Sequence, residues 1–475
     1  MFRQLNCKLS KHIKKKQMKQ AGIKYSLLIS VVLLSVTLFA QQTRQFVHPG
    51  ILHTQASIDY AYKKAAAKEY PWYNTYLDFS QASYSKKTYV MSGGDSIATR
   101  DASYNTATRN HKLALESDAY AIYSQALMYK LLKNDDYAKN VVKILNDWSY
   151  KLKRIVGADQ TLTVAFNAYF MACGAELIRS YSGFTEADQN QAKKMFREIW
   201  YPQVQSISRY GGQGTWDSSS AKCVMAMAIY LEDADMYDSA YNYFYNGVGN
   251  GTINHYFIET GQSQESGRKQ GYAQLGLGNF EEWCEIAYNQ GSPELWNARN
   301  NIIAASFEYH AKYNLGESVP FTTIQGQYDG TTFSSISADG RGDFKPIYYM
   351  AYNHFHNRYG ISMPYTKRVI DEKQPLEKMH ATITDGAGYG SLFFNNPEQV
   401  PAAVKQNIDN NYIVFATDNY LVLKNCENTH LKVFNILGKQ VCDLDINDNI
   451  ERIALDKGFY IAQVDDSFTQ KLIIK

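Results

Sequence analysis

Apolar side chains recur at every third or fourth position from about residue 55 to residue 315, which is the spacing of amphipathic helices. One stripe runs from Leu115 to Leu127 and the next from Val141 to Ile155, with a short polar turn between them. The same helix–turn–helix order returns around the sequence LEDAD, which follows Tyr230. Repeated helical hairpins build bundles, solenoids or closed toroids. Because no strict repeat period is visible, a toroid or an irregular bundle is favoured over an open solenoid, and we predict an all-α domain over residues 41–400.

The amino-acid composition of the sequence changes after Pro320. Gly, Ser, Thr and aromatic residues are frequent up to about residue 400, which predicts long loops on the surface of the helical body and one helix near 346–359. Residues 401–417 are predicted to be a linker. Apolar and polar residues then alternate in short runs, so residues 418–475 are predicted to form a small β-sandwich.

The first 40 residues have the composition of an export signal. They contain eight Lys and Arg residues and no Asp or Glu, and a largely apolar run from Tyr25 to Ala40 follows the basic part. This run is shorter than the roughly 20 apolar residues that a membrane-spanning helix needs. Residues 1–40 are therefore predicted to be a signal peptide, whose removal leaves no stable membrane span.

Charge and cysteine content exclude several classes of protein. Residues 1–40 contain eight of the 49 basic residues and none of the 46 acidic ones, so the rest of the chain carries a net charge of −5, which argues against a nucleic-acid-binding protein. The five cysteines after the leader show no CxxC or Cys/His metal spacing. We expect no metal and no other cofactor. Cys426 and Cys442 lie in one small C-terminal unit and could pair.

The densest polar cluster is ETGQSQESGRKQGYAQ, residues 259–274, at the predicted start of a helix. Arg268 and Tyr272 are four residues apart and would share one helix face. A guanidinium beside a phenol favours the phenolate, which could act as a base. Such a pair suits β-elimination at a uronic acid, which needs a base at C5, an acid at the leaving O4 and donors on the carboxylate. The alternative is a solvated helix start with a capping Glu.

Two segments, GGQGTWDSSSAKCVMAMAIYLEDADMYDSA (211–240) and GQSQESGRKQGYAQLGLGNFEEWCEIAYNQG (261–291), resemble the alginate-lyase superfamily of polysaccharide lyases, most closely polysaccharide lyase family 38. RGDFKPIYYMAYNHF (341–355) and GAGYGSLFF (386–394) resemble later segments of that family. The resemblance covers about residues 50–395. It implies an α/α toroid with a cleft or tunnel for an acidic polysaccharide, alginate or glucuronan. The chain departs from the family at Thr215, where members have Asn, at Lys269, which replaces an acid, and at Tyr272, where many have His.

The resemblance implies roles for individual residues. Tyr272 would be both base and acid, with Gln213 and Arg268 on the substrate carboxylate, which suits syn elimination. His255 is a candidate second base. We expect a local basic patch around Arg268, Lys269 and Arg341. Eight residues are candidate substrate-binding groups, with the two aromatic rings as sugar platforms: Trp216, Tyr309, Gln264, Glu265, Asn110, His111, Arg341 and His354. For Asn110 and His111, a helix-capping role is an equal alternative. For the aromatic residues near His354, packing in the core is the alternative.

Three segments at the C-terminus, VFNILGKQV, ALDKGFYIAQV and QKLIIK, resemble the sorting domain of the type nine secretion system, with Phe434 in place of the usual Tyr. The resemblance implies export across both membranes of a Gram-negative bacterium, with the secretion machinery as partner and a secreted or cell-surface location. The alternative is a carbohydrate-binding β-module.

Taken together, the sequence predicts a secreted polysaccharide lyase that cleaves a uronic-acid polymer by β-elimination. A glycoside hydrolase on the same toroid would need two carboxylates in the cleft, for which Glu265 and Asp217 are the candidates. A non-catalytic glycan-binding protein would tolerate the loss of Tyr272. A helical interaction scaffold would not depend on glycans at all.

Overall fold

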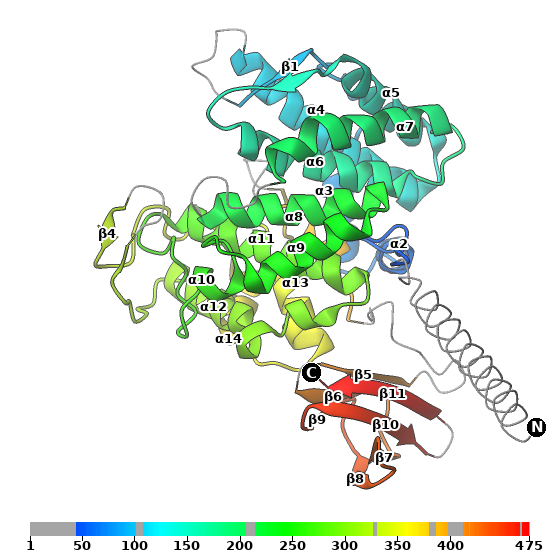
Figure 1. Ribbon diagram of the computed structural model, residues 1–475, viewed down its shortest axis with the longest axis vertical. Coiled ribbons are helices and arrows are strands. Elements are labelled where there is room, and N and C mark those ends of the chain that lie inside the picture. Colours follow the sequence, from blue (N-terminus) through cyan, green and yellow to red (C-terminus); the bar gives the residue numbers. More distant parts are fainter. Residues whose placement is uncertain are drawn as a thin grey trace, which may run out of the picture. The chain divides into compact units, whose positions relative to one another are not determined.

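The computed structural model describes residues 44–100, 108–205, 214–325, 330–379, 386–397, 412–417, 419–465 and 468–474. Residues 1–45 and 46–475 are separate compact units. The second unit consists of a helical body followed by two small antiparallel sheets (Figure 1). Within the described residues, no helix is both long enough and apolar enough to cross a bilayer.

Helical hairpins form the body. Four long helices, each followed by a second helix, contact one another in chain order: α4 (Thr108–Leu132), α6 (Gln160–Leu177), α8 (Gly214–Leu231) and α11 (Gln270–Asn289). Their partners are α5 (Asp135–Lys151), α7 (Glu186–Met195), α9 (Ala234–Asn246) and α12 (Ala298–Asn314). The shorter elements of the body are α2 (Gln55–Ala66), α3 (Trp72–Gln81), η1 (Ser83–Ser85), β1 (Ile97–Ala98), β2 (Arg154–Ile155), η2 (Phe196–Trp200), η3 (Tyr201–Gln203), α10 (Ile253–Tyr256), η4 (Pro293–Leu295), β3 (Ile324–Gln325), β4 (Thr332–Phe333), α13 (Tyr348–Tyr352), η5 (Asn353–Arg358), α14 (Pro364–Glu372) and α15 (Gly390–Phe393).

The predicted hairpin turns owe their shape to two kinds of residue. Lys133 and Glu232 adopt left-handed φ angles of 54° and 58° directly before the next helix is capped. The side chains of Asn134 and Asp233 then accept hydrogen bonds from the first-turn backbone N–H groups of α5 and α9. These caps satisfy donors that a helix start otherwise leaves without partners, so the chain reverses direction within a few residues.

Helices α6, α8 and α11 form the inner layer, because almost every residue along them is buried. Helices α5 and α9 bury only one face and cover them. Since each inner helix is followed by an outer helix that runs back, successive inner helices point in the same direction. Their N-terminal ends therefore lie at one end of the body. This arrangement is the predicted α/α toroid.

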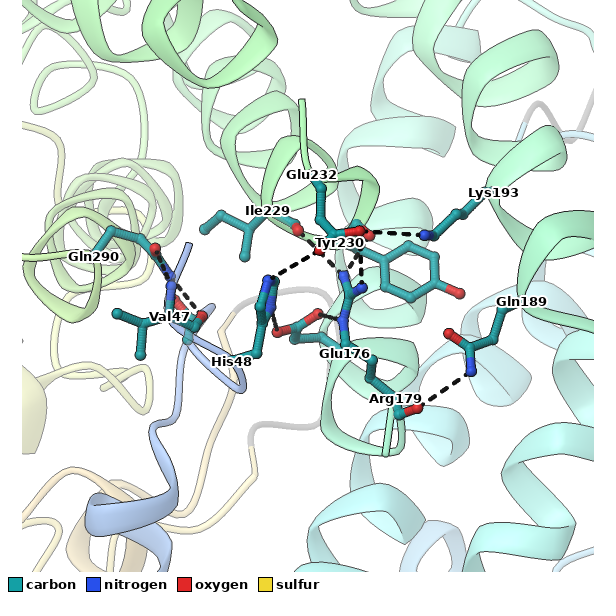
Figure 2. A network of polar contacts seen from close by, with 11 residues as sticks. Val47, His48, Glu176, Arg179, Gln189, Lys193, Ile229, Tyr230, Glu232 and Gln290 are labelled. Carbon is teal, nitrogen blue, oxygen red and sulfur yellow. Dashed lines mark hydrogen bonds and ion pairs between the residues drawn. The ribbon is translucent and has the colours of Figure 1, made fainter. Parts of the chain in front are cut away.

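A short N-terminal strap, residues 46–54, fastens the opposite ends of the inner helices (Figure 2). His48 Nδ1 lies 2.5 Å from Glu176 on α6, and Arg179 donates to the same carboxylate and to backbone carbonyls at the end of α8. The side chain of Gln290, just after α11, exchanges hydrogen bonds of 2.9 and 3.1 Å with the backbone of Val47. The strap thus ties three inner helices together.

The glycine-rich segment 386–394 lies inside the body, not on its surface as predicted. The Tyr120 hydroxyl donates to Ala387 O at 2.7 Å, and Ala387 N donates to Glu282 at 2.9 Å. Gly390 permits this path, because a Cβ there would overlap the carboxylate of Glu377. The prediction failed because a run of glycines and aromatics is typical of both an exposed loop and a closely packed interior segment.

The C-terminal region is a β-sandwich, as predicted. One sheet has the order β5–β6–β9 and the other β11–β10–β7–β8, and all pairs are antiparallel. Apolar side chains from both sheets form one core. The strands are β5 (Ile413–Ala416), β6 (Tyr420–Lys424), β7 (Thr429–Asn435), β8 (Gln440–Ile446), β9 (Ile450–Ala454), β10 (Gly458–Val464) and β11 (Phe468–Ile474). Strand β5 falls within the predicted linker, of which residues 401–411 lie outside the described part of the chain.

Candidate functional site

The inner helices are accessible only near their N-terminal ends. Along α8, all of whose residues are described, only Trp216 is not buried. Along α11, also fully described, only Gly271, Tyr272 and Leu275 are not buried, and Tyr272 is 39% exposed. Since the N-terminal ends of α8 and α11 lie at the same end of the toroid, these side chains are the solvent-accessible part of the two helices at that end.

Arg268 and Tyr272 are in direct contact, as predicted, but they do not share a helix. Helix α11 begins at Gln270, because Lys269 has an extended backbone with φ −167° and ψ 137°. Arg268 lies in the turn before the helix, and its side chain extends forward over the helix start. Its guanidinium carbon lies 4.2 Å from the centroid of the Tyr272 ring, which is a cation–π contact.

Glu265 links this pair to the start of α8. It is 7% exposed, and its Oε2 lies 3.3 Å from Arg268 Nη1. A Cβ on Gly214, the first residue of α8, would lie 3.2 Å from Glu265 Oε1 and 3.5 Å from Gln264 Oε1. Asn250 accepts from the backbone N–H of Gly214 and from the amide of Gln264. The start of α8, which carries Trp216, therefore adjoins the loop that leads to Arg268 and Tyr272.

His255 lies beside a different carboxylate, that of Asp217. Its Nδ1 is 2.9 Å from Gly249 O, and because a carbonyl oxygen can only accept, Nδ1 carries a proton in this contact. Asp217 is 3% exposed and accepts from the Tyr243 hydroxyl and from Gly251 N. Burial raises the pKa of Asp217 to about 6. Its carboxylate is thus occupied in holding the loop 249–251 against α8.

Two of the predicted substrate-binding residues, Tyr309 and His354, are buried. Tyr309 is 5% exposed and its hydroxyl donates to Pro320 O at 2.7 Å, so its ring is part of the packing. His354 is fully buried and stacks on Trp296 with ring centroids 4.3 Å apart. Burial, together with nearby Arg358, lowers its pKa well below the usual value. The predicted contact of His354 with substrate is therefore wrong, because the helix face that carries it turns into the core.

Arg341 braces a loop instead of facing the site. Its guanidinium lies 4.1 Å from the ring of Tyr313 and donates to the backbone carbonyls of Tyr313 and Glu317. Within the predicted basic patch, Lys269 pairs with Asp339 at 3.4 Å. Gln213 lies outside the described residues, as do the side chains of Asn110 and His111 in the first turn of α4.

Lys345 was not among the predicted site residues, although it lies in one of the segments that carry the resemblance. It is 7% exposed, and its side chain reaches the start of α11 beside Gly271. A lone lysine between Phe344 and Pro346 has no sequence signal of its own. In the part of the chain that the structure describes, no three His, Cys, Asp or Glu side chains are grouped so as to hold a metal ion.

Comparisons with known proteins agree with this architecture. The sequence profile of the alginate lyase family matches residues 54–321. Alginate lyase A1-III from Sphingomonas species A1 superposes with a TM-score of 0.51 over 75% of this chain and 99% of that enzyme, at 10% sequence identity. A variant of alginate lyase A1-III in complex with a tetrasaccharide gives the same TM-score and identity over 76% of this chain and 100% of that one. A search among curated proteins finds no match.

The structural likeness establishes the shared α/α toroid, and the sequence profile extends over more than half of the chain. The protein therefore belongs to the alginate lyase family and is a polysaccharide lyase.

Proposed function

We propose that this lyase cleaves a polyuronate, alginate or glucuronan, by β-elimination at Tyr272. The observation that carries the proposal is the position of Tyr272, the exposed aromatic side chain at the accessible end of α11, with a guanidinium 4.2 Å from its ring. It is the one place described here where a phenol, a cation and a helix N-terminus meet at the accessible end of the toroid.

In the proposed reaction the Tyr272 oxygen takes the proton from C5, next to the sugar carboxylate. The electron pair of the broken C–H bond forms the C4–C5 double bond, and the C4–O4 bond breaks. The proton then passes from Tyr272 to the departing O4, so that one side chain serves both transfers on one face of the sugar. The products are a new non-reducing end with an unsaturated uronate and a free hydroxyl on the other fragment.

Arg268 is proposed to stabilise the negative charge that develops on the carboxylate as C5 loses its proton. The N-terminus of the 20-residue helix α11 adds partial positive charge at the same place. Gln213 is proposed as a second donor to the carboxylate, and Trp216 as an aromatic surface for the sugar ring. The partners of His255 favour a supporting role for it, in the loop that covers Asp217.

The test is ultraviolet absorbance of the unsaturated product, measured with purified protein on a panel of polyuronates. We expect absorbance to rise on at least one polymer and Tyr272→Phe to lower the rate by at least about 100-fold, the contribution typical of a general acid–base group. Tyr150→Phe is the matched control, because Tyr150 is also exposed and lies on the outer helix α5.

Two other outcomes would reject elimination. New reducing ends without absorbance would indicate hydrolysis, for which Glu265 and Asp217 would be the carboxylates, although Glu265 pairs with Arg268 and Asp217 is bonded to Tyr243 and Gly251. Glycan binding without either signal would indicate a non-catalytic protein.

We further propose that residues 1–40 direct export and that the C-terminal sandwich directs passage across the outer membrane by the type nine machinery. Support comes from the sequence resemblance of the tail and from its compact core, separate from the main hydrophobic cluster. Expression in a bacterium with that machinery, with and without residues 412–475, tests this. Retention of the shortened protein in the periplasm is expected, and equal secretion of both forms would contradict it.

A further inference from the structure

The segment 337–345 packs against the start of α11. Gln270 fastens its first half: the backbone N–H of Gln270 donates to Asp339 O at 2.9 Å, and its side-chain amide donates to Ser337 O at 2.9 Å. Gly340 has a left-handed φ of 74°, which favours glycine, and it lies beside the helix start, since a Cβ there would be in ordinary contact with Gly271 N at 3.6 Å. Residues nearly 70 positions apart in sequence thus meet beside Tyr272.

Gln274 forms hydrogen bonds with the second half of the segment 337–345. It is fully buried, and its amide nitrogen donates to Asp343 O at 2.7 Å. Its Oε1 accepts from Lys345 N and from the Tyr348 hydroxyl, both at 3.0 Å. Gln274 lies one helical turn after Gln270, so both amides face the same segment. The backbone of Lys345 is therefore fixed with respect to the helix that carries Tyr272.

The two lysines of this region meet at Gly271, the residue before Tyr272. A Cβ on Gly271 would lie 3.7 Å from Lys345 Cε and 3.9 Å from Lys269 Cε. Lys269 is 45% exposed and forms a 3.4 Å pair with the exposed carboxylate of Asp339, whereas Lys345 is 7% exposed. One exposed and one buried lysine side chain thus border the space beside Gly271, where a Cβ would be in ordinary contact with both.

We propose that Lys345 and Lys269 form a second carboxylate-binding point, for the uronate next to the one that reacts at Tyr272, with Gln274 as the positioning residue that holds Lys345 there. This inference rests on the proposed function, because a polyuronate carries a carboxylate on every sugar. When the substrate binds, its carboxylate replaces Asp339 as the partner of Lys269. The contact forms in the ground state as well as in the transition state, so it lowers KM more than it raises kcat.

Lys345→Met is the first test, with Lys345→Arg as the variant that keeps the charge. On the polyuronate that the wild type cleaves, we expect Lys345→Met to raise KM about tenfold, the effect of losing one charge-assisted hydrogen bond. We expect kcat to change by less than about threefold and Lys345→Arg to recover part of the loss. The salt dependence of kcat/KM should weaken in Lys345→Met. Lys139→Met, on the exposed side of α5, is the control.

Substitution of Gly271 tests the same space with a matched pair. Asp and Asn have the same shape, but only Asp brings a carboxylate between the two lysines, in place of the substrate. An acidic residue in the first turn of α11 also favours the helix, so Gly271→Asp should fold. We expect Gly271→Asp to raise KM several-fold more than Gly271→Asn does.

Gln274→Met tests the positioning role, because it should raise KM with little change in kcat. A general loss of the fold would not separate the two constants in this way. The variant should raise KM as Lys345→Met does and keep the pH profile of kcat; if it does not fold, the Lys345 and Gly271 variants still decide the proposal. Unchanged KM and salt dependence in Lys345→Met, in an enzyme that eliminates normally, would overturn this inference alone. Absence of elimination by the wild type would instead overturn the proposed function.

Discussion

Glu265 is the residue that fixes the orientation of Arg268 over Tyr272. Its buried carboxylate lies 3.3 Å from the guanidinium and attracts it to the side of the turn that faces the Tyr272 ring. Glu265→Gln removes the charge and keeps the shape, so we predict a fall in kcat/KM of about tenfold with little change in thermal stability. Steady-state elimination kinetics measure it. The control is Glu259→Gln, which removes an exposed Glu partner of Arg299 from the same loop. Equal kinetics for Glu265→Gln and wild type would contradict the orienting role.

Single residues also show which features of the site could be predicted from the sequence and which could not. The pairing of Arg268 with Tyr272 could be predicted, because residues four apart come together in or beside a helical turn. The burial of Tyr309 could not, because each of 38 tyrosines can be a platform, a packing ring or a base, and only the neighbours decide. The prediction for His354 was wrong for the same reason, because its stacking partner Trp296 comes from a distant turn.

At the scale of elements, the hairpin of β3 and β4 rests on the turn that carries Arg268. A Cβ on Gly267 would lie 2.6 Å from Cγ of Phe333 and would overlap its Cβ as well. Gly267→Ala should therefore displace the hairpin or the turn, and we predict a several-fold loss of kcat/KM together with faster proteolysis near residues 324–333. Phe333→Gly removes both of these atoms and makes room for the added methyl group.

The double variant Gly267→Ala/Phe333→Gly decides between this contact and a backbone effect at Gly267. If the contact is the cause, adding Gly267→Ala to Phe333→Gly costs less than adding it to the wild type, which is a non-additive cycle. Equal losses in both backgrounds would place the cause in the backbone of the turn.

Elements were predictable where local signals define them. The hairpin turns before α5 and α9 contain their own caps, Asn134 and Asp233, so the order of helices follows from sequence. The segment 386–394 contains no such signal, since its conformation depends on Tyr120 and Glu282 from distant helices. Strand β5 was assigned to the linker because its four residues are too few to show an alternating pattern.

At the scale of the whole molecule, four glutamates lie buried at the centre of the helical body, each at most 2% exposed: Glu281, Glu282, Glu285 and Glu377. Lys222 pairs with Glu282, and Arg358 pairs with Glu285. Burial and neighbouring carboxylates raise the pKa of Glu281 well above its usual value. Burial raises the pKa of Glu377 to about 8, although Tyr348 N and Tyr349 N donate to it. At neutral pH the interior therefore holds protons that the unfolded chain would release.

The consequence is a stability that falls as the pH rises. Glu377 has a pKa of about 8 in the folded state and 4.5 in the unfolded state. Its contribution to the free energy of unfolding is complete below about pH 4.5 and is lost as the pH approaches 8, with an upper bound of about 5 kcal/mol. Asp217, with a pKa raised to about 6, acts in the same direction over the lower part of this range.

We predict that the midpoint of thermal unfolding falls between pH 5 and pH 8 in the wild type and falls less in Glu377→Gln. The amide stays neutral at every pH, and its oxygen can still accept from Tyr348 N. Scanning calorimetry across this range measures the effect, with Glu198→Gln, an exposed glutamate of η2, as the control that keeps the wild-type slope. A slope in Glu377→Gln equal to that of the wild type would mean that Glu377 is ionised in the folded protein. The backbone N–H groups of Tyr348 and Tyr349, which donate to this carboxylate, would then be what stabilises a buried negative charge at Glu377.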